Sequence, residues 1–243
     1  MDEVVLHASF VAASPASVAL GANEMHVWAV PLHGDPDRWG VHLSKAERQR
    51  LERFHFADHR RRYQIGHGAL RMILAGYLQM EPAAIDFTQG PRGKPYVVGK
   101  PLFFNLSHSG KLALIGLGAA ELGVDVEKVR HLESLGEIAR KHFSPSEFEA
   151  LSPLAGDARE LAFYRCLTRK EAYIKAVGEG LTMPLDTFDV SLCEEPRFLD
   201  CRDGRGSAED WSLLDVSPGP DFVGAAAMRA RGVSCKRFRL QAS

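Results

Sequence analysis

The chain has 243 residues, 45% of them hydrophobic and 25% charged, which is the composition of a globular protein with one large domain or two small ones. Lysine and arginine number 30, and aspartate and glutamate number 31, for a formal net charge of −1. This balance excludes a nucleic-acid-binding protein that relies on its overall charge, so no nucleic-acid partner is expected.

The first twenty residues do not look like a targeting segment. Residues 4–20 are uncharged, but Asp2 and Glu3 precede them where a secretory signal carries positive charge, and polar residues interrupt them too often for a membrane span. The four cysteines form no C-x-x-C pair, which excludes a zinc ribbon and indicates reduced thiols. We therefore expect a cytoplasmic protein with no membrane partner.

Ser44 marks the clearest helix start in the first part of the chain. Glu47, three residues later, gives the spacing of a capping box, and a helix is expected from there to about Phe56. The other elements expected in this part are a strand over 25–32, a helix over 58–80, a loop over 90–95, and strands over 103–106 and 111–117.

Ser144 marks the strongest helix start in the second part, because Pro145 follows at the first helical position and Glu147 at the third. The other elements expected here are a strand over 123–129, helices over 132–142 and 157–177, and short strands between about 187 and 240. Each part thus offers helices and strands. We expect an α+β fold of two similar halves that meet near residues 118–123.

Asp125 and Glu127 are the first candidate functional residues. Residues two apart on a strand share a face, so Val124 and Val126 should point to the core and the two carboxylates together to the other side. Two carboxylates on one face suit a hard cation such as Mg²⁺. A half-buried strand with a solvated acidic face is the alternative interpretation.

Glu171 and Lys175 are four residues apart and should share one face of a helix. Alone, they are also explained as a surface ion pair worth only about 0.3–0.5 kcal/mol. If Glu171 faces Asp125 and Glu127, however, three carboxylates can hold one cation. Lys175, one turn further on, could then touch a phosphate bound to that cation.

The segment FNLSHSG at 104–110 is expected to end a strand in a tight polar turn formed by Ser107, His108 and Ser109. Such turns bind anions through hydroxyl, imidazole and backbone N–H groups, although a simple capped turn has the same composition. Ser107 and His108 do not indicate a nucleophilic dyad, because neighbours on an extended segment point apart and no G-x-S-x-G motif is present.

Basic side chains gather in the first half, and arginine suits bidentate capture of phosphate. Most of them should be solvated, with one or two binding a ligand. Lys94 stands on a loop between Gly93 and Pro95, where a fixed backbone could hold it near a ligand; an exposed loop lysine is the alternative. The arginines concerned are Arg48, Arg50, Arg53, Arg60, Arg61, Arg62 and Arg71.

Five motifs follow one another along the chain: GKP at 93–95, FNLSHS at 104–109, GVDVE at 123–127, FSPSEF at 143–148 and KEAYIKAVGEGL at 170–181. Together they resemble the 4′-phosphopantetheinyl transferases of the surfactin-synthetase-activating (Sfp) type, over about residues 43–192. The resemblance implies two pseudo-equivalent α+β halves, 1–120 and 121–243, with the active site in the cleft between them. A monomer is implied by the same analogy.

The resemblance also implies an activity. The enzyme would transfer the 4′-phosphopantetheine group of coenzyme A to a serine hydroxyl of an apo acyl, aryl or peptidyl carrier protein, with Mg²⁺ or Mn²⁺, and release 3′,5′-ADP. The first half would contact the 3′-phosphate and adenosine of coenzyme A. The second half would hold the metal, and the stretch 127–149 would face the carrier protein.

Carried onto this chain, the resemblance gives each candidate residue a role. The metal ligands would be Asp125, Glu127 and Glu171, and the residues that bind coenzyme A would be Arg50, Arg62, Lys94, Ser107, His108 and Lys175. Glu171 is the candidate general base, with a metal-bound water as the alternative. Lys175 would lie at the pyrophosphate and stabilise the leaving group. Arg62 and His108 would meet the 3′-phosphate, and Lys94 the adenosine.

Two positions depart from the family pattern: Leu167 stands where the family usually has Trp, and Glu47 where it often has a phosphate-binding Lys. Two other functions remain open at this stage. D-x-E followed by E-x-x-x-K also suits a metal-dependent nuclease or phosphohydrolase, although the near-zero net charge argues against it. A non-catalytic module that binds coenzyme A or a carrier protein is the second, and the intact set of three carboxylates argues against that.

Overall fold

The computed structural model describes residues 4–241; residues 1–3, which include Asp2 and Glu3, and residues 242–243 lie outside that description. The helices are α1 (Asp37–Gly40), α2 (Lys45–Leu51), α3 (Ala57–Leu78), α4 (Leu135–His142), α5 (Pro145–Leu151) and α6 (Gly156–Val177). The strands are β1 (Val11–Ala13), β2 (Glu24–Pro31), β3 (Phe87–Gln89), β4 (Pro95–Val97), β5 (Phe103–Ser109), β6 (Leu112–Gly118), β7 (Leu122–Lys128), β8 (Phe188–Val190), β9 (Phe198–Cys201), β10 (Ser212–Asp215), β11 (Phe222–Met228) and β12 (Ser234–Leu240).

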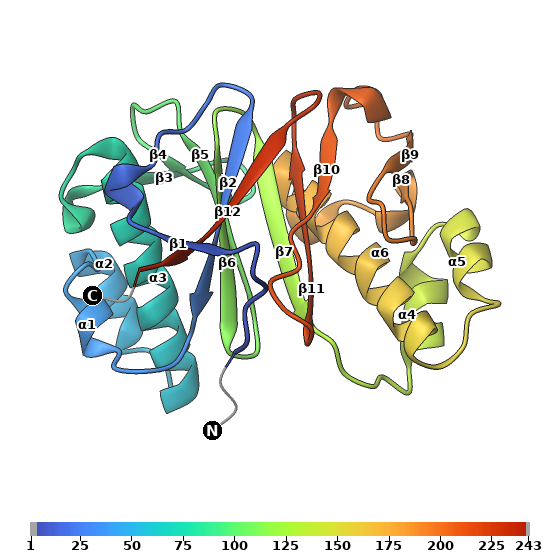
Figure 1. The fold of residues 1–243 in the computed structure, drawn as a ribbon, viewed down its shortest axis with the longest axis horizontal. Coiled ribbons are helices and arrows are strands. Elements are labelled where there is room, and N and C mark those ends of the chain that lie inside the picture. Colours follow the sequence, from blue (N-terminus) through green and yellow to red (C-terminus); the bar gives the residue numbers. More distant parts are fainter. Residues whose placement is uncertain (1–3, 242–243) are drawn as a thin grey trace.

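The elements form four layers, in the order helix, sheet, sheet, helix (Figure 1). The first of the two large sheets has the strand order β1-β12-β2-β6-β5, and the second has the order β10-β11-β7; β3 pairs with β4, and β8 with β9, in two-stranded sheets. Three apolar cores fill the spaces between layers: α3 packs on the first sheet, the two sheets pack on each other, and α6 packs on the second sheet. The α+β fold expected from the sequence is confirmed.

The side chains of β7 alternate between two of these cores. Val124 and Val126 are fully buried between the sheets. Asp125 lies on the other face of the strand, where Lys175 of α6 contacts it. The alternation in the sequence therefore predicted the orientation of this strand correctly.

Both capping boxes are present. Ser44 accepts a hydrogen bond from the backbone N–H of Glu47, whose side chain bonds back to Ser44, and Ser144 and Glu147 do the same at α5. The helix after Ser44 ends at Leu51, however, and does not reach Phe56. The chain turns there because Phe54 packs on Tyr63 of α3, with ring centroids 5.2 Å apart.

The last strand belongs to the first sheet. β12 lies between β1 and β2 and runs parallel to both. The sheets otherwise change between β6 and β7, close to the expected boundary at 118–123. The division into residues 1–120 and 121–243 stays a prediction, and β12 is an element of the second part that pairs with the first.

Two features of the structure bear on the expected reduced thiols and on the expected absence of a membrane partner. All four cysteines, Cys166, Cys193, Cys201 and Cys235, are free thiols. Between residues 4 and 241, no helix combines the length and the apolar character that crossing a membrane requires.

Lys170 of α6 and Glu147 of α5 form an ion pair in the interior, with 0% and 2% of each residue exposed. Lys170 Nζ lies 2.8 Å from Glu147 Oε1 and donates hydrogen bonds to the carbonyl oxygens of Leu185 and Phe188, both at 2.6 Å. The ammonium therefore has three acceptors, and the pair fixes α5 and the start of β8 against α6. Lys170 has a structural role.

Replacing Lys170 by Met leaves Glu147 as an unpaired charge in the interior, so we expect K170M to lower the free energy of unfolding by about 3–5 kcal/mol. Urea denaturation followed by circular dichroism measures the change. The same substitution at the exposed Lys128 should cost less than about 0.5 kcal/mol. Adding Glu147→Gln to Lys170→Met should recover part of the loss; a double variant less stable than K170M would contradict this account.

Candidate functional site

The candidate site lies where the edge strands of the two sheets, β5 and β7, meet. Asn105 of β5 accepts a hydrogen bond from the backbone N–H of Val124 through its side-chain oxygen, at 3.0 Å. Two residues further on, Ser107 Oγ donates to Asp125 Oδ1 at 2.8 Å. These side chains share one face of β5 because they are two residues apart, so side-chain hydrogen bonds hold the two edges together.

Ser109 continues this row. Its Oγ donates to Glu127 Oε2 at 2.7 Å and accepts from the backbone N–H of Lys128 at 3.0 Å. The expected polar turn at 107–109 is therefore wrong, because β5 pairs with β6 as far as Ser109 opposite Leu112. The hydroxyls of this motif orient carboxylates from a strand.

Gly123 brings α6 onto β7. A Cβ atom at residue 123 would lie 2.2 Å from the Ala172 carbonyl oxygen and 2.4 Å from the Ala176 nitrogen, which are backbone atoms of α6. Only glycine permits this approach. Because Gly123 shares its face of β7 with Asp125, the last two turns of α6 lie directly over the carboxylates.

Lys175, from the last turn of α6, reaches into the site. Its Nζ lies 2.5 Å from Asp125 Oδ1 and donates to Ser107 Oγ at 2.9 Å. Asp125 and Ser107 are buried, and the Lys175 side chain is 29% exposed. The structure thus joins three of the candidate residues, from β5, β7 and α6, in direct contact.

The charges of Asp125 and Lys175 act on the pKa of both Glu127 and Glu171. Burial raises the pKa of Glu171, and the negative charges of Asp125 and Glu127 raise it further, while Lys175 lowers it. Burial also raises the pKa of Glu127, with Asp125 adding to the rise against the hydrogen bond from Ser109. Negative charge from neighbouring carboxylates therefore opposes the ionisation of Glu127 and Glu171.

One buried oxygen of the site is left without a hydrogen bond. Within residues 4–241, Asp125 Oδ2 has no hydrogen-bond partner, although Asp125 is only 3% exposed. No group of three or more His, Cys, Asp or Glu side chains within residues 4–241 is gathered closely enough to hold a metal ion as it stands. Lys175 instead occupies the other oxygen of Asp125. The donors are all carboxylate oxygens, which fit a hard cation.

His108 points away from this cluster, since it follows Ser107 on the same strand. Its exposed imidazole faces the α3 side of the sheet, toward Arg62 and His67. Surrounding protein atoms lower the pKa of His108, and the charges of Arg62, Lys175 and His67 lower it further. One face of β5 thus meets the carboxylates, and the other carries an imidazole.

The structure does not bring Arg50 or Lys94 into the carboxylate cluster. The Arg50 guanidinium lies over the ring of Tyr63, 5.3 Å from its centroid. Lys94 is 8% exposed, and its Nζ donates to the carbonyl oxygens of Leu122 at 2.9 Å and Ala176 at 2.6 Å. Burial lowers the pKa of Lys94 to about 8. Its ammonium joins the β3–β4 hairpin to α6.

The two departures from the family pattern have structural partners. Glu47 forms an ion pair with the buried Arg71 and lies 3.3 Å from His67 Nδ1. Burial raises the pKa of Glu47, but hydrogen bonds from His67 and Ser44 together with Arg71 outweigh it and lower the pKa to about 2. Leu167 packs against the core beneath α6. Neither position adds a ligand to the site.

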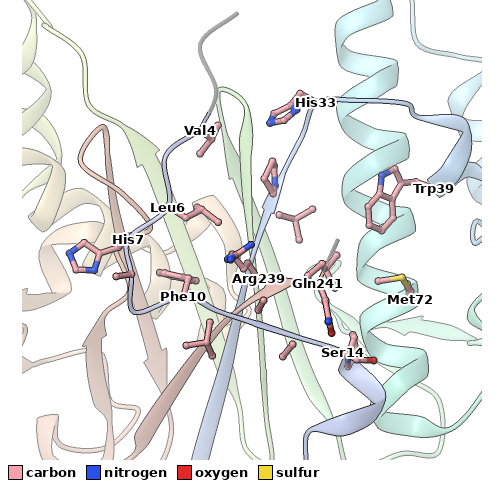
Figure 2. Close-up of a pocket in the computed structure, with 18 of the residues that line it drawn as sticks. Val4, Leu6, His7, Phe10, Ser14, His33, Trp39, Met72, Arg239 and Gln241 are labelled. Atoms are coloured by element: carbon pink, nitrogen blue, oxygen red, sulfur yellow. The ribbon is translucent and has the colours of Figure 1, made fainter. Parts of the chain in front are cut away.

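A separate hollow of about 1190 Å³ lies between the N-terminal segment, α3 and the end of β12 (Figure 2). Phe10, Trp39, Met72 and Arg239 are among its lining residues. None of the candidate site residues lines it, so the hollow and the carboxylate cluster are different places on the molecule.

Two family models match consecutive parts of the chain: "4′-phosphopantetheinyl transferase, N-terminal" over residues 31–120 and "4′-phosphopantetheinyl transferase superfamily" over residues 121–227. The 4′-phosphopantetheinyl transferase HetI of Nostoc sp. strain PCC 7120 is 36% identical over 227 residues, which cover 90% of this chain and 93% of that protein. The chain belongs to the 4′-phosphopantetheinyl transferase family.

Other relatives agree. A 4′-phosphopantetheinyl transferase of Bacillus subtilis is 31% identical, with 81% of this chain and 91% of the relative covered. The 4′-phosphopantetheinyl transferase Sfp of Bacillus subtilis strain 168 is 30% identical, with 65% and 70% covered. The resemblance drawn from the five motifs is confirmed, and the chain is a transferase enzyme of this family.

The sequence does not show the roles of three residues of this cluster. Asn105 and Ser109 belong to the FNLSHSG segment, and only their spacing of two from Ser107 indicates that all three share one strand face. Gly123 belongs to the GVDVE motif, which gives it no role. Glycine is required at residue 123 because the backbone of α6, nearly fifty residues later in the chain, contacts it there. No local sequence pattern contains that contact.

Gly123→Ala should separate α6 from β7, because backbone atoms on both elements would have to move. We expect the free energy of unfolding to fall by about 1–3 kcal/mol or more. Because Lys175 and Glu171 would shift, we also expect transferase activity to fall by at least about tenfold. Urea denaturation and product mass spectrometry measure the two effects.

Gly66→Ala is the matched control, since a Cβ at this buried position in α3 meets nothing closer than 3.6 Å. It should be neutral or slightly stabilising, by helix propensity. Wild-type stability in Gly123→Ala would show that the α6 contact is not as tight as described.

Proposed function

We propose that this transferase moves the 4′-phosphopantetheine group of coenzyme A onto a serine hydroxyl of an apo acyl, aryl or peptidyl carrier protein, with Mg²⁺ or Mn²⁺ assisting and 3′,5′-ADP leaving. The observation that carries the proposal is the buried Asp125, whose Oδ1 pairs with Lys175 beside Ser107 on a strand face shared with Glu127, in a chain of this family. Residues 1–120 would contact the 3′-phosphate and adenosine, and residues 121–243 the metal and the carrier. A cytoplasmic location accords with this reaction.

Asp125, Glu127 and Glu171 are the residues that would hold the divalent cation. All three offer carboxylate oxygens, which both Mg²⁺ and Mn²⁺ accept. The buried Oδ2 of Asp125 has no partner and is an atom that a cation would satisfy. When bound, the cation supplies positive charge at the pyrophosphate of coenzyme A.

Arg62 and His108 would bind the 3′-phosphate from the other face of β5. An arginine and an imidazolium form charge-assisted hydrogen bonds to phosphate oxygens. They lie apart from the carboxylates, so they would orient coenzyme A rather than take part in bond making. Ser107 would lie between the two groups, beside the pyrophosphate.

In the transfer, the carrier serine oxygen forms a bond to the phosphorus of the phosphopantetheine group as the bond from that phosphorus to 3′,5′-ADP breaks. Glu171 would accept the serine proton, because no side chain within residues 4–241 hydrogen-bonds to its carboxylate. Lys175 would donate to the oxygen that leaves with the electron pair. Such phosphoryl chemistry depends mainly on positioning and charge.

Intact-mass spectrometry of an apo carrier protein tests the proposal. With coenzyme A and Mg²⁺, the carrier should gain one phosphopantetheine group, and a chelator should abolish the gain. Glu171→Gln should lower the rate by at least about 10²-fold, since it removes the general base. Glu194→Gln, the same change at an exposed loop position, should have no effect. No gain with acyl, aryl or peptidyl carriers would refute the proposal.

His108 gives coenzyme A binding a pH dependence. Its pKa is lowered in the free protein, and a bound 3′-phosphate would raise it, so affinity should fall as pH rises through the pKa of the complex and then level off. At pH 6, His108→Gln should bind coenzyme A about tenfold more weakly than wild type, and at pH 8 the difference should shrink. Isothermal titration calorimetry measures both.

The phosphate titrates in the same range, so 3′-dephospho-coenzyme A is the control ligand. With it, wild type and His108→Gln should show the same pH dependence. If the affinity for coenzyme A itself changed equally with pH in wild type and in His108→Gln, that result would contradict the role proposed for His108.

A further inference from the structure

Lys175 contacts Asp125 and Ser107, whereas the proposed transfer step requires it to contact the leaving oxygen of the pyrophosphate. Its Nζ lies 2.5 Å from Asp125 Oδ1 and 2.9 Å from Ser107 Oγ, inside the carboxylate cluster. A lysine that serves the pyrophosphate would have to point its ammonium at a phosphate oxygen instead. The side chain therefore needs two positions.

Lys175 pairs with a carboxylate that would also hold the cation. No other ion pair to Asp125, Glu127 or Glu171 is found within residues 4–241, so Lys175 supplies the positive charge of the cluster. Even so, Asp125 Oδ2 remains without a partner. A divalent cation on Asp125 would lie within a few ångströms of the Lys175 ammonium, and two positive charges repel strongly in such a weakly solvated place.

The surroundings allow Lys175 to move without disturbing the fold. Its backbone is fixed by the contact of α6 with Gly123, while its side chain is 29% exposed. The long alkyl chain of lysine turns about four bonds and carries a mobile charge. Lys170, five residues earlier on the same helix, is by contrast 0% exposed and held by three acceptors.

We propose that Lys175 is a built-in counter-ion that pairs with Asp125 and competes with the divalent cation for that carboxylate. The inference rests on the proposed function. Lys175 must leave Asp125 for the cation to bind, and the pyrophosphate of coenzyme A then offers its ammonium a new partner. The free enzyme should therefore bind the cation weakly, and cation and coenzyme A should enter together.

Mn²⁺ binding in the absence of coenzyme A tests the competition. Electron paramagnetic resonance of unbound Mn²⁺ gives the dissociation constant for wild type and for Lys175→Gln, which keeps a hydrogen-bonding side chain without the charge. We expect Lys175→Gln to bind Mn²⁺ at least about tenfold more tightly. An affinity equal to or weaker than that of wild type would overturn the proposal.

Lys128→Gln is the matched control. It removes the same charge one residue from Glu127 on β7, and its side chain is exposed and makes no ion pair within residues 4–241. Mn²⁺ affinity should change by less than about threefold. An equal gain in both variants would mean that overall charge, and not competition at Asp125, controls binding, and it would also overturn the proposal.

A second measurement needs no variant. Reductive methylation of the wild-type protein, read by peptide mass spectrometry, reports how free each lysine amine is. Mg²⁺ alone should increase the labelling of Lys175, because the amine leaves Asp125, and should leave Lys128 unchanged. Unchanged or reduced labelling of Lys175 at saturating Mg²⁺ would refute the counter-ion.

The transfer assay keeps the two proposals separate. Tighter Mn²⁺ binding by Lys175→Gln supports the counter-ion even if no carrier protein gains a phosphopantetheine group. Transfer by the wild type together with unchanged Mn²⁺ affinity in Lys175→Gln overturns the counter-ion and leaves the proposed function intact.

Discussion

The backbone contact between Gly123 and α6 sets the geometry of the whole site. Because glycine has no side chain, the backbone of α6 packs directly on the backbone of β7 at this residue. Asp125, the next residue on that face, then meets Lys175 at ion-pair distance. A larger residue at 123 would increase the separation of strand and helix, and the charges that depend on short distances would no longer interact as strongly.

The first sheet contributes to the same site from its edge. Strand β5 ends its sheet and meets β7, the edge of the other sheet, through Asn105, Ser107 and Ser109. Exposed strand edges invite unwanted pairing, and these hydrogen bonds close one such edge inside the molecule. One row of polar side chains therefore both joins the two sheets and orients the acidic residues. His108 lies on the opposite face of the same strand.

Local patterns predicted most of the fold and part of the site. The period of two along β7 placed Asp125 and Glu127 on one face, and the capping boxes located the starts of α2 and α5. What the sequence did not predict depends on partners distant in the chain. Ser109 is held by Glu127 of the next sheet, and Lys94 is buried because Leu122 of β7 and Ala176 of α6 each offer it a carbonyl oxygen.

The position of β12 has a consequence for how the protein is made. Because this strand lies between β1 and β2, the edge of β2 stays unpaired on the ribosome until residues 234–240 emerge. The sheet that carries His108 is complete only after residues 121–233 have been synthesised. The two halves match separate family models, yet the first cannot close its sheet during translation without the last strand of the second. The first sheet is therefore closed only after the second half of the chain has been made.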